Sequence, residues 1–125
     1  MIVGLGVDVV HVSRIERWMR VPGLVERFFH PDEISASLRR GQAAALSLAA
    51  RFAAKEAFGK ALGTGLAGIR LRDIQVVNNH NGKPCMYLHD TAQSVYARSG
   101  AKLIHLSLTH ERENAIAMVV LETWD

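Results

Sequence analysis

A carboxylate set among cations is the first feature of this sequence that could do chemistry. On a long helix, Arg51, Lys55, Glu56 and Lys60 would follow one another around one side, next to Gly59. Glycine costs up to about 1 kcal/mol in a helix interior, so its presence here indicates room left for a ligand. This combination fits many phosphate-binding sites. Glu56 and Lys60 are also an ordinary i, i+4 ion pair, and their spacing alone favours that interpretation.

Asp8 is a second carboxylate, in a segment with a different period. Residues 2–10 form a short, β-branched apolar run that predicts a buried strand. In the two-residue period of a strand, Gly4, Gly6 and Asp8 share one face, where another group could approach closely. Asp8 could equally cap the next turn of the chain, and its position alone does not decide between the two roles.

The element expected to carry Glu56 is the longest helix, over residues 42–62. This segment is rich in alanine, lacks proline and ends at Gly63-Thr64-Gly65. The methyl groups on one third of its circumference would let another element pack very closely. They belong to Ala50, Ala53, Ala54, Ala57 and Ala61.

The other elements predict an α+β fold with a largely antiparallel sheet, formed as a single domain over residues 1–125. Two short helices are expected first, over residues 13–20 behind a capping box at Ser13 and Glu16, and over residues 24–29. A third helix should run from Pro31 to near Gly41. A later helix should begin behind an N-cap at Asp90 or Thr91 and end at about Arg98. Strands are expected over residues 74–77 and 83–88, joined by a turn at Asn81-Gly82, and over 103–109 and 115–121 as a closing pair.

The composition excludes several classes of protein. Hydrophobic residues make up 49% of the 125 and charged residues 22%, which is enough apolar material for a core. No apolar run approaches the roughly 20 residues needed to cross a bilayer, and the start lacks the basic leader of a signal peptide. A single cysteine, Cys85, fits a reducing cytoplasm, and the six scattered histidines lack zinc spacing. The net charge of +3 indicates an anionic partner without naming it.

The segment Arg51–Gly65 closely resembles the signature of bacterial holo-acyl-carrier-protein synthases, the short-chain 4'-phosphopantetheinyl transferases. Other elements of that family occur here in the family's order and span residues 4 to 121. They are Gly6-Val7-Asp8, a basic residue at Arg14, the turn Gly82-Lys83-Pro84, and Ser107-Leu108-Thr109-His110 before the last strand. The resemblance implies an enzyme that moves 4'-phosphopantetheine from coenzyme A to a serine of apo acyl carrier protein, releasing adenosine 3',5'-bisphosphate.

The resemblance assigns metal binding to Asp8 and Glu56. Oxygen ligands suit Mg²⁺, which proteins usually hold with one or two carboxylates together with substrate phosphates and water. A cation bridging the pyrophosphate would neutralise charge that develops on the leaving group. The base that takes the serine proton is left open among a metal-bound water, Glu56 and His110.

Coenzyme A is expected to contact several basic and glycine-rich positions. Lys60 would reach a phosphate, and Gly63-Thr64-Gly65 would let backbone groups of the protein approach the nucleotide. Arg51 and Lys83 would meet the 3'-phosphate or pyrophosphate. Each has an ordinary alternative: a helix C-cap for the glycines and a solvated surface charge for the two cations. Pro84 matches the family's turn and could serve only to shape it. His110 would orient the nucleotide or handle the proton.

The partner expected from the resemblance is an acidic acyl carrier protein, and Arg14 matches a position that contacts it in the family. Arg17 and Arg20 follow at three-residue spacing on the same short helix, which could extend this docking surface or be an ordinary solvated face. The family also implies a homotrimer with coenzyme A between subunits. A module that binds RNA or nucleotides without chemistry is a rival, but it would leave Asp8, Glu56 and Gly59 unused and lacks aromatic residues at stacking intervals. A degenerate member that only binds is a second rival, which the intact Asp8, Glu56 and Lys60 disfavour.

Overall fold

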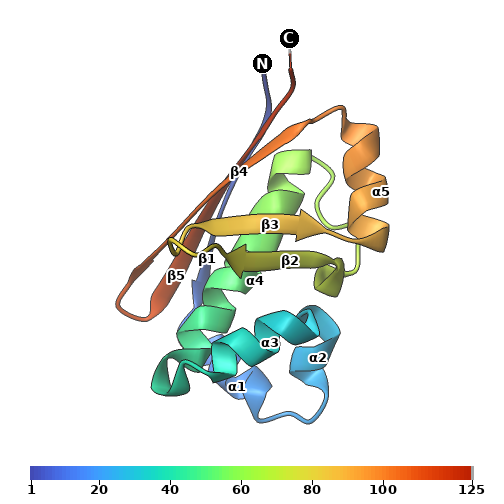
Figure 1. Ribbon diagram of the computed structural model, residues 1–125. Helices are drawn as coiled ribbons and strands as arrows, with labels where there is room; N and C mark the ends of the chain where they lie inside the picture. Colours follow the sequence, from blue (N-terminus) through green and yellow to red (C-terminus); the bar gives the residue numbers. More distant parts are fainter. Residues whose placement is uncertain (125) are drawn as a thin grey trace.

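The computed structural model describes residues 1–124 and is built around the long helix α4 (Ala44–Leu62). This helix lies along one face of a three-stranded antiparallel sheet with strand order β1–β5–β4 (Figure 1). The three strands are Ile2–His11 (β1), Asn114–Glu122 (β5) and Leu103–Glu111 (β4). Because other elements cover the opposite side, most of α4 is buried. The predicted α+β class and the long central helix are confirmed.

A second, two-stranded sheet covers α4 on the side away from the first. It is the antiparallel hairpin of β2 (Ile74–Asn78) and β3 (Pro84–Leu88), which crosses the long helix in Figure 1. Helix α5 (Asp90–Ser99) follows, and its N–terminal region is tied to the turn before β2 because the Thr91 hydroxyl bonds the Asp73 carboxylate. The antiparallel strands therefore form two sheets where one was expected.

Three short helices close one end of the molecule. They are α1 (Val12–Met19), α2 (Leu24–Phe28) and α3 (Pro31–Leu38), and a 3₁₀ turn at Gly41–Ala43 leads into α4. Pro31 occupies the first turn of α3, as predicted, and the His30 ring accepts the Asp32 N–H while Glu33 accepts the His30 N–H. One hydrophobic core joins these helices to both sheets. Within residues 1–124, no helix is both long and apolar enough to cross a membrane.

The closest packing in the fold lies between β1 and the alanine face of α4. A Cβ atom on Gly6 would stand 1.9 Å from the Ala57 carbonyl oxygen, and one on Gly4 would stand 1.8 Å from that of Ala61. The predicted close approach on both segments is confirmed, and each turns out to be the partner of the other. Glycine is required in the strand because the helix backbone fills the space of a side chain.

Strand β1 differs from the prediction of a buried strand. It forms an edge of the sheet, and Val3, Leu5, Val7 and Val9 on its outer face are 41%, 61%, 47% and 57% exposed. The periodicity was correctly predicted, but the side of the strand that meets the core is the glycine side. Burial there comes from backbone contact of Gly4 and Gly6 with α4 and from the side chain of Val10, which is 1% exposed.

Two predicted helix caps are wrong. Helix α1 begins at Val12 behind His11, with no side-chain cap, because β1 runs straight into it and the Val12 N–H bonds the Glu113 carbonyl at 2.7 Å. Helix α5 begins behind His89, and Thr91 bonds Asp73 instead of capping its own helix. In both cases contacts with a distant segment fix the start of the helix.

The long helix and the closing strands match the prediction within a few residues. Helix α4 starts two residues later than expected and ends at Gly63, which has a φ of +83°. Strands β4 and β5 are antiparallel neighbours, as predicted. Because β4 extends to Glu111, His110 lies inside the strand, paired with Ala115, and not in a loop.

Candidate active site

Asp8 and Glu56 lie on two elements that touch, β1 and α4. The strand passes over the helix at Gly6, and Asp8 follows on the same face of the strand. Burial raises the pKa of Glu56, and the Asp8 carboxylate raises it further, whereas Arg14 and Lys60 oppose the shift. The fold therefore brings together two carboxylates that are far apart in the sequence, together with two cations.

Lys60 holds the Asp8 carboxylate directly. Its Nζ lies 3.0 Å from Asp8 Oδ1 and 3.1 Å from the Val7 carbonyl oxygen, so the ammonium makes two hydrogen bonds to β1. The Asp8 side chain is 18% exposed and that of Lys60 is 56% exposed. Lys60 therefore bridges α4 to β1 from the solvent side of the pair.

Arg14 is held beside the carboxylates by aromatic rings. Its guanidinium carbon lies 5.0 Å from the centre of the Trp18 ring and 5.2 Å from that of Phe52. These two rings pack edge to face at 4.9 Å, and Phe28 lies against Trp18 at 5.1 Å. Cation–π contacts of this kind hold an exposed arginine in one orientation.

Lys55 and Arg51, the other two cations predicted on this side of α4, point away from Asp8 and into the interior. Lys55 is fully buried and donates to the Glu33 carboxylate at 2.7 Å and to the carbonyl oxygens of Leu71 and Ile74. Burial lowers the pKa of Lys55, and the Glu33 carboxylate opposes that shift. The prediction of a carboxylate flanked by Arg51, Lys55 and Lys60 on one side of the helix is therefore wrong, because the helix is buried on both sides and distributes its charges between them.

The structure explains the glycine at position 59 by chain packing, and not by room for a ligand as predicted. A Cβ atom there would lie 3.0 Å from the backbone of Gly65 and 3.0 Å from the side chain of Leu66. The Gly65 N–H donates to the Gly59 carbonyl at 3.0 Å. The gap is thus filled by the chain leaving α4, and it is not open to a ligand.

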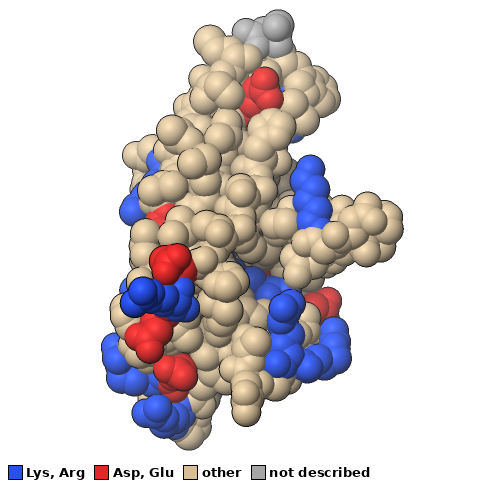
Figure 2. All heavy atoms as spheres, turned by 90° about the vertical axis from the view of Figure 1, so that its left-hand side faces the viewer, with Lys and Arg blue, Asp and Glu red and all other residues tan. Residues whose placement is uncertain are grey.

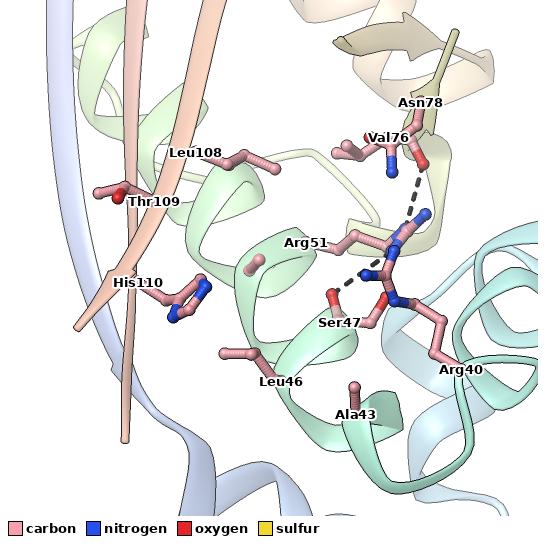
Figure 3. A pocket seen from close by; sticks show the side chains of 11 residues that line it. Arg40, Ala43, Leu46, Ser47, Arg51, Val76, Asn78, Leu108, Thr109 and His110 are labelled. Carbon is pink, nitrogen blue, oxygen red and sulfur yellow. Dashed lines mark hydrogen bonds between the residues drawn. The ribbon is translucent and has the colours of Figure 1, made fainter. Parts of the chain in front are cut away.

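Arg51 forms one wall of a pocket between α4, the hairpin and β4 (Figure 3). The guanidinium is buried and donates to the Val76 carbonyl at 3.2 Å and to the Ser47 hydroxyl. Burial lowers its pKa, while Glu33 opposes this shift. The pocket has a volume of about 170 Å³, and His110 approaches it from β4 in Figure 3. Its other polar lining residues are Arg40, Ser47, Asn78 and Thr109.

The remaining predicted residues lie elsewhere on the chain. Gly63-Thr64-Gly65 forms the C-terminal cap of α4, and Thr64 lines a separate hollow against α5 that also contains Arg98. Lys83 and Pro84 lie at the turn of the hairpin, where the Asn79 side chain accepts the Lys83 N–H at 3.0 Å. One chain therefore carries the predicted residues in several separate places.

No cluster of three or more histidine, cysteine, aspartate or glutamate side chains that could hold a metal ion occurs in residues 1–124. Asp8 and Glu56 alone would supply two carboxylates. Such a pair fits Mg²⁺, which commonly completes its coordination with phosphate oxygens and water, and does not fit zinc, which prefers histidine and cysteine.

Comparison with known proteins decides the family. Residues 4–119 match the model of the 4'-phosphopantetheinyl transferase superfamily. The chain belongs to this superfamily. It is 54% identical to a holo-[acyl-carrier-protein] synthase of Treponema denticola, covering 98% of this chain and 99% of the relative, and 48% identical to one of Treponema pallidum, covering 98% and 97%.

Solved structures agree with this assignment. A holo-(acyl-carrier-protein) synthase of Bacillus anthracis in complex with CoA (3',5'-ADP) superposes with a TM-score of 0.82 at 35% identity over 99% of each chain. The holo-[acyl-carrier-protein] synthase of Neisseria meningitidis superposes with a TM-score of 0.88 at 32% identity over 98% of this chain and 100% of that one. The resemblance read from the sequence is confirmed.

Sequence reasoning missed parts of the pocket beside Arg51. Arg40 lies between α3 and the 3₁₀ turn and Asn78 ends β2, and no spacing in the sequence relates them to each other or to Arg51. Glu33, which is 1% exposed and pairs with Lys55, belongs to none of the motifs that the sequence offers. A charged residue inside an apolar alanine helix, such as Lys55, is the signal that could have pointed to a buried partner.

Proposed function

We propose that this protein transfers the 4'-phosphopantetheine group of coenzyme A to a serine of an apo acyl carrier protein, releasing adenosine 3',5'-bisphosphate. The serine oxygen forms a new bond to the phosphorus that bears pantetheine, and the bond from that phosphorus to the bridging pyrophosphate oxygen breaks. The serine proton passes to a base. The observation that supports the proposal is that the β1–α4 contact brings the carboxylates of Asp8 and Glu56 close together in a member of this superfamily.

Asp8 and Glu56 are proposed to hold Mg²⁺. Burial and the neighbouring Asp8 make a second negative charge costly at Glu56, which is the condition under which a divalent cation binds well. When bound, the ion would supply charge neutralisation at the pyrophosphate. Lys60 extends from the same helix on the solvent side, so it is proposed to contact a phosphate of coenzyme A.

The pocket beside Arg51 is the proposed site for the anionic nucleotide end of coenzyme A. Arg40 and Arg51 supply positive charge there, and His110 and Thr109 supply polar groups. We propose that Lys83, Pro84 and the glycine turn Gly63-Thr64-Gly65 make further contacts with the same substrate. The Arg51 guanidinium donates hydrogen bonds to the Val76 carbonyl and the Ser47 hydroxyl, and these bonds fix its position in the pocket.

We propose that His110 binds the nucleotide rather than taking the serine proton within one chain. Strand β5 lies between β1 and β4, so two strand spacings of about 4.8 Å place β4 roughly 10 Å from the strand of Asp8. His110 lines the pocket beside Arg51, and neither Asp8 nor Glu56 lines that pocket, so a contact between His110 and the nucleotide is the simpler role within one chain. Glu56 and a metal-bound water stay as the candidate bases, together with a His110 supplied by a neighbouring subunit.

A homotrimer with sites between subunits is proposed from the outer face of the three-stranded sheet. Leu5, Val7 and Val9 of β1 are 61%, 47% and 57% exposed, and Met118 of the adjoining strand β5 is 45% exposed. Figure 2 shows that much of this side of the molecule carries no charged residues. Exposed apolar patches of this kind mark association surfaces. Assembly would also bring the separate groups of predicted residues together.

Helix α1 is the proposed docking surface for the acidic carrier protein. Arg14, Arg17 and Arg20 are all exposed there, and Met19 is 37% exposed beside them. Charge complementarity of this kind governs association with an acidic partner. With Cys85 a free thiol, we propose that the reaction takes place in the cytoplasm, with residues 1–125 acting as one transferase domain.

The test is direct. The protein is incubated with apo acyl carrier protein, coenzyme A and Mg²⁺, and the carrier is examined by intact-mass spectrometry for the phosphopantetheine adduct. Adduct formation that stops in EDTA supports the proposal. A folded protein that binds coenzyme A and yields no adduct would refute it and favour a binding-only role.

Matched variants then test the metal assignment. Asp8→Asn and Glu56→Gln remove one charge each and should reduce the rate by at least about 100-fold, while Asp90→Asn makes the same change at an exposed position of α5. Wild-type rates for Asp8→Asn and Glu56→Gln would show the assignment to be wrong. Arg17→Glu, at an exposed position of α1, should raise the KM for carrier protein by about tenfold and leave the KM for coenzyme A unchanged, with Lys102→Glu as the control at an exposed position elsewhere.

A further inference from the structure

The Lys60 ammonium forms an ion pair with the carboxylate of Asp8, which is proposed to bind the metal. Its Nζ donates to Asp8 Oδ1 at 3.0 Å and to the Val7 carbonyl at 3.1 Å. Two acceptors on consecutive residues of β1 fix the ammonium better than a single exposed ion pair would. The contact is made where Gly6 presses the strand against the helix, so both partners stand on backbone that cannot easily shift.

The four charges at this place balance one another. Asp8 and Glu56 are negative, Lys60 and Arg14 are positive, and the other three all act on the carboxylate of Glu56. Arg14 is stacked on the rings of Trp18 and Phe52, so Lys60 is the cation in direct contact with Asp8. A divalent cation entering alone would meet a neutral cluster whose carboxylate is already engaged by Lys60. A divalent cation entering with a pyrophosphate brings its own negative charge, and that charge also attracts the ammonium.

Lys60 is able to change partners. Its side chain is 56% exposed, whereas that of Asp8 is 18% exposed. A lysine side chain has four rotatable bonds and three donors on a compact ammonium, so its head can leave one acceptor for another without movement of the helix. Arg14, which is clamped between aromatic rings, does not have this freedom.

We propose that Lys60 is an internal counter-ion of Asp8, released when the pyrophosphate of coenzyme A takes over its ammonium, so that the divalent cation and coenzyme A bind cooperatively. This inference rests on the proposed function and adds to it the coupling between the two ligands. By linkage, the factor by which coenzyme A strengthens metal binding equals the factor by which the metal strengthens coenzyme A binding.

The coupling is measured by Mn²⁺ binding, followed by the loss of the free-ion electron paramagnetic resonance signal, without carrier protein. Wild-type protein should bind Mn²⁺ weakly alone and about tenfold or more tightly with coenzyme A. Lys60→Met should bind Mn²⁺ about two- to fivefold more tightly than wild type in the absence of coenzyme A, the range expected for loss of an exposed ion pair. The gain that coenzyme A adds should be correspondingly smaller. Lys60→Gln should behave in the same way.

Arg14→Met is the matched control, since it removes one positive charge near Glu56 without touching Asp8. A smaller effect than that of Lys60→Met supports release of a bound counter-ion. Equal effects from both variants, or no change in Lys60→Met, would overturn the inference. Asp8→Asn separates the two levels of argument. If Asp8→Asn binds Mn²⁺ as wild type does, the metal site of the proposed function is wrong; if only Lys60→Met is without effect, the metal site stands and the counter-ion role fails.

Discussion

Replacing Gly6 by alanine tests the β1–α4 contact on which the carboxylate pair depends. The added Cβ atom would lie 1.9 Å from the Ala57 carbonyl oxygen and 2.8 Å from the Ala61 nitrogen, both in helix backbone. Ordinary contact for such an atom begins at 3.4 Å, so strand and helix must separate by about 1.5 Å along that direction. Neither obstacle is a side chain that could rotate away.

The expected cost follows from two opposing effects. Inserting a methyl group into tightly packed structure costs typically about 1–3 kcal/mol. Glycine to alanine also restricts the unfolded chain, which returns about 0.4–1 kcal/mol when the native backbone suits alanine, as it does in this extended strand. Because the clash is with backbone, the upper part of the first range applies, and a net loss of about 2 kcal/mol corresponds to a fall in Tm of about 5–10 °C.

The functional loss should exceed the loss of stability. Asp8 lies on the shifted strand and Glu56 on the helix, so the separation of the two carboxylates changes with the contact. A misplacement of about 1 Å can reduce a rate by about 100-fold. Thermal unfolding would be followed by circular dichroism, and transfer to carrier protein by intact mass at a temperature where the variant is fully folded.

Gly100→Ala is the control for this experiment. Gly100 has a φ of +84° and no atom within 4 Å of its Cβ position, so alanine there costs about 1 kcal/mol of backbone strain without moving the site. The folded Gly100→Ala protein should transfer at the wild-type rate. A Gly6→Ala protein with wild-type Tm and wild-type rate would refute the steric reasoning.

Three further outcomes are expected. Lys55→Met should lower the free energy of unfolding, measured in urea, by about 3–5 kcal/mol, because it leaves the Glu33 carboxylate buried without its ammonium partner. The double variant Lys55→Met/Glu33→Gln should recover part of that loss. A Lys55→Met protein as stable as wild type would contradict this reasoning. Burial and Asp8 raise the pKa of Glu56 in the folded state above the unfolded carboxyl pKa of about 4.3. Between these two pKa values the folded protein holds a proton that the unfolded chain has lost. The free energy of unfolding therefore falls as the pH rises through this window. Glu56→Gln in EDTA should therefore be more stable than wild type at pH 7 and equal to it below pH ~4, and a less stable variant at pH 7 would reverse the sign of this argument. Leu5→Asp should shift the molecular mass measured by light scattering toward that of a monomer, and an unchanged mass would remove β1 from the proposed subunit interface.

The amino-acid sequence by itself determined the periodic features of this protein. The alanine-rich segment without proline predicted α4 to within two residues at its start, and Gly63 predicted its end, because helix propensity and left-handed caps are local properties. The alternation in residues 2–10 predicted which residues of β1 share a face. Motifs with fixed order predicted the family, since they record which residue types recur at each position.

Tertiary structure alone decided where these features point. The face of β1 that meets the core is the glycine face, because α4 approaches its backbone and leaves Val7 outside. The same helix is buried on two sides, so Lys55 turns inward to Glu33 while Lys60 turns outward to Asp8, although helix periodicity had placed both on one side. Such choices depend on which distant segment lies opposite, and burial of a charge is tolerated only where that segment supplies the opposite charge.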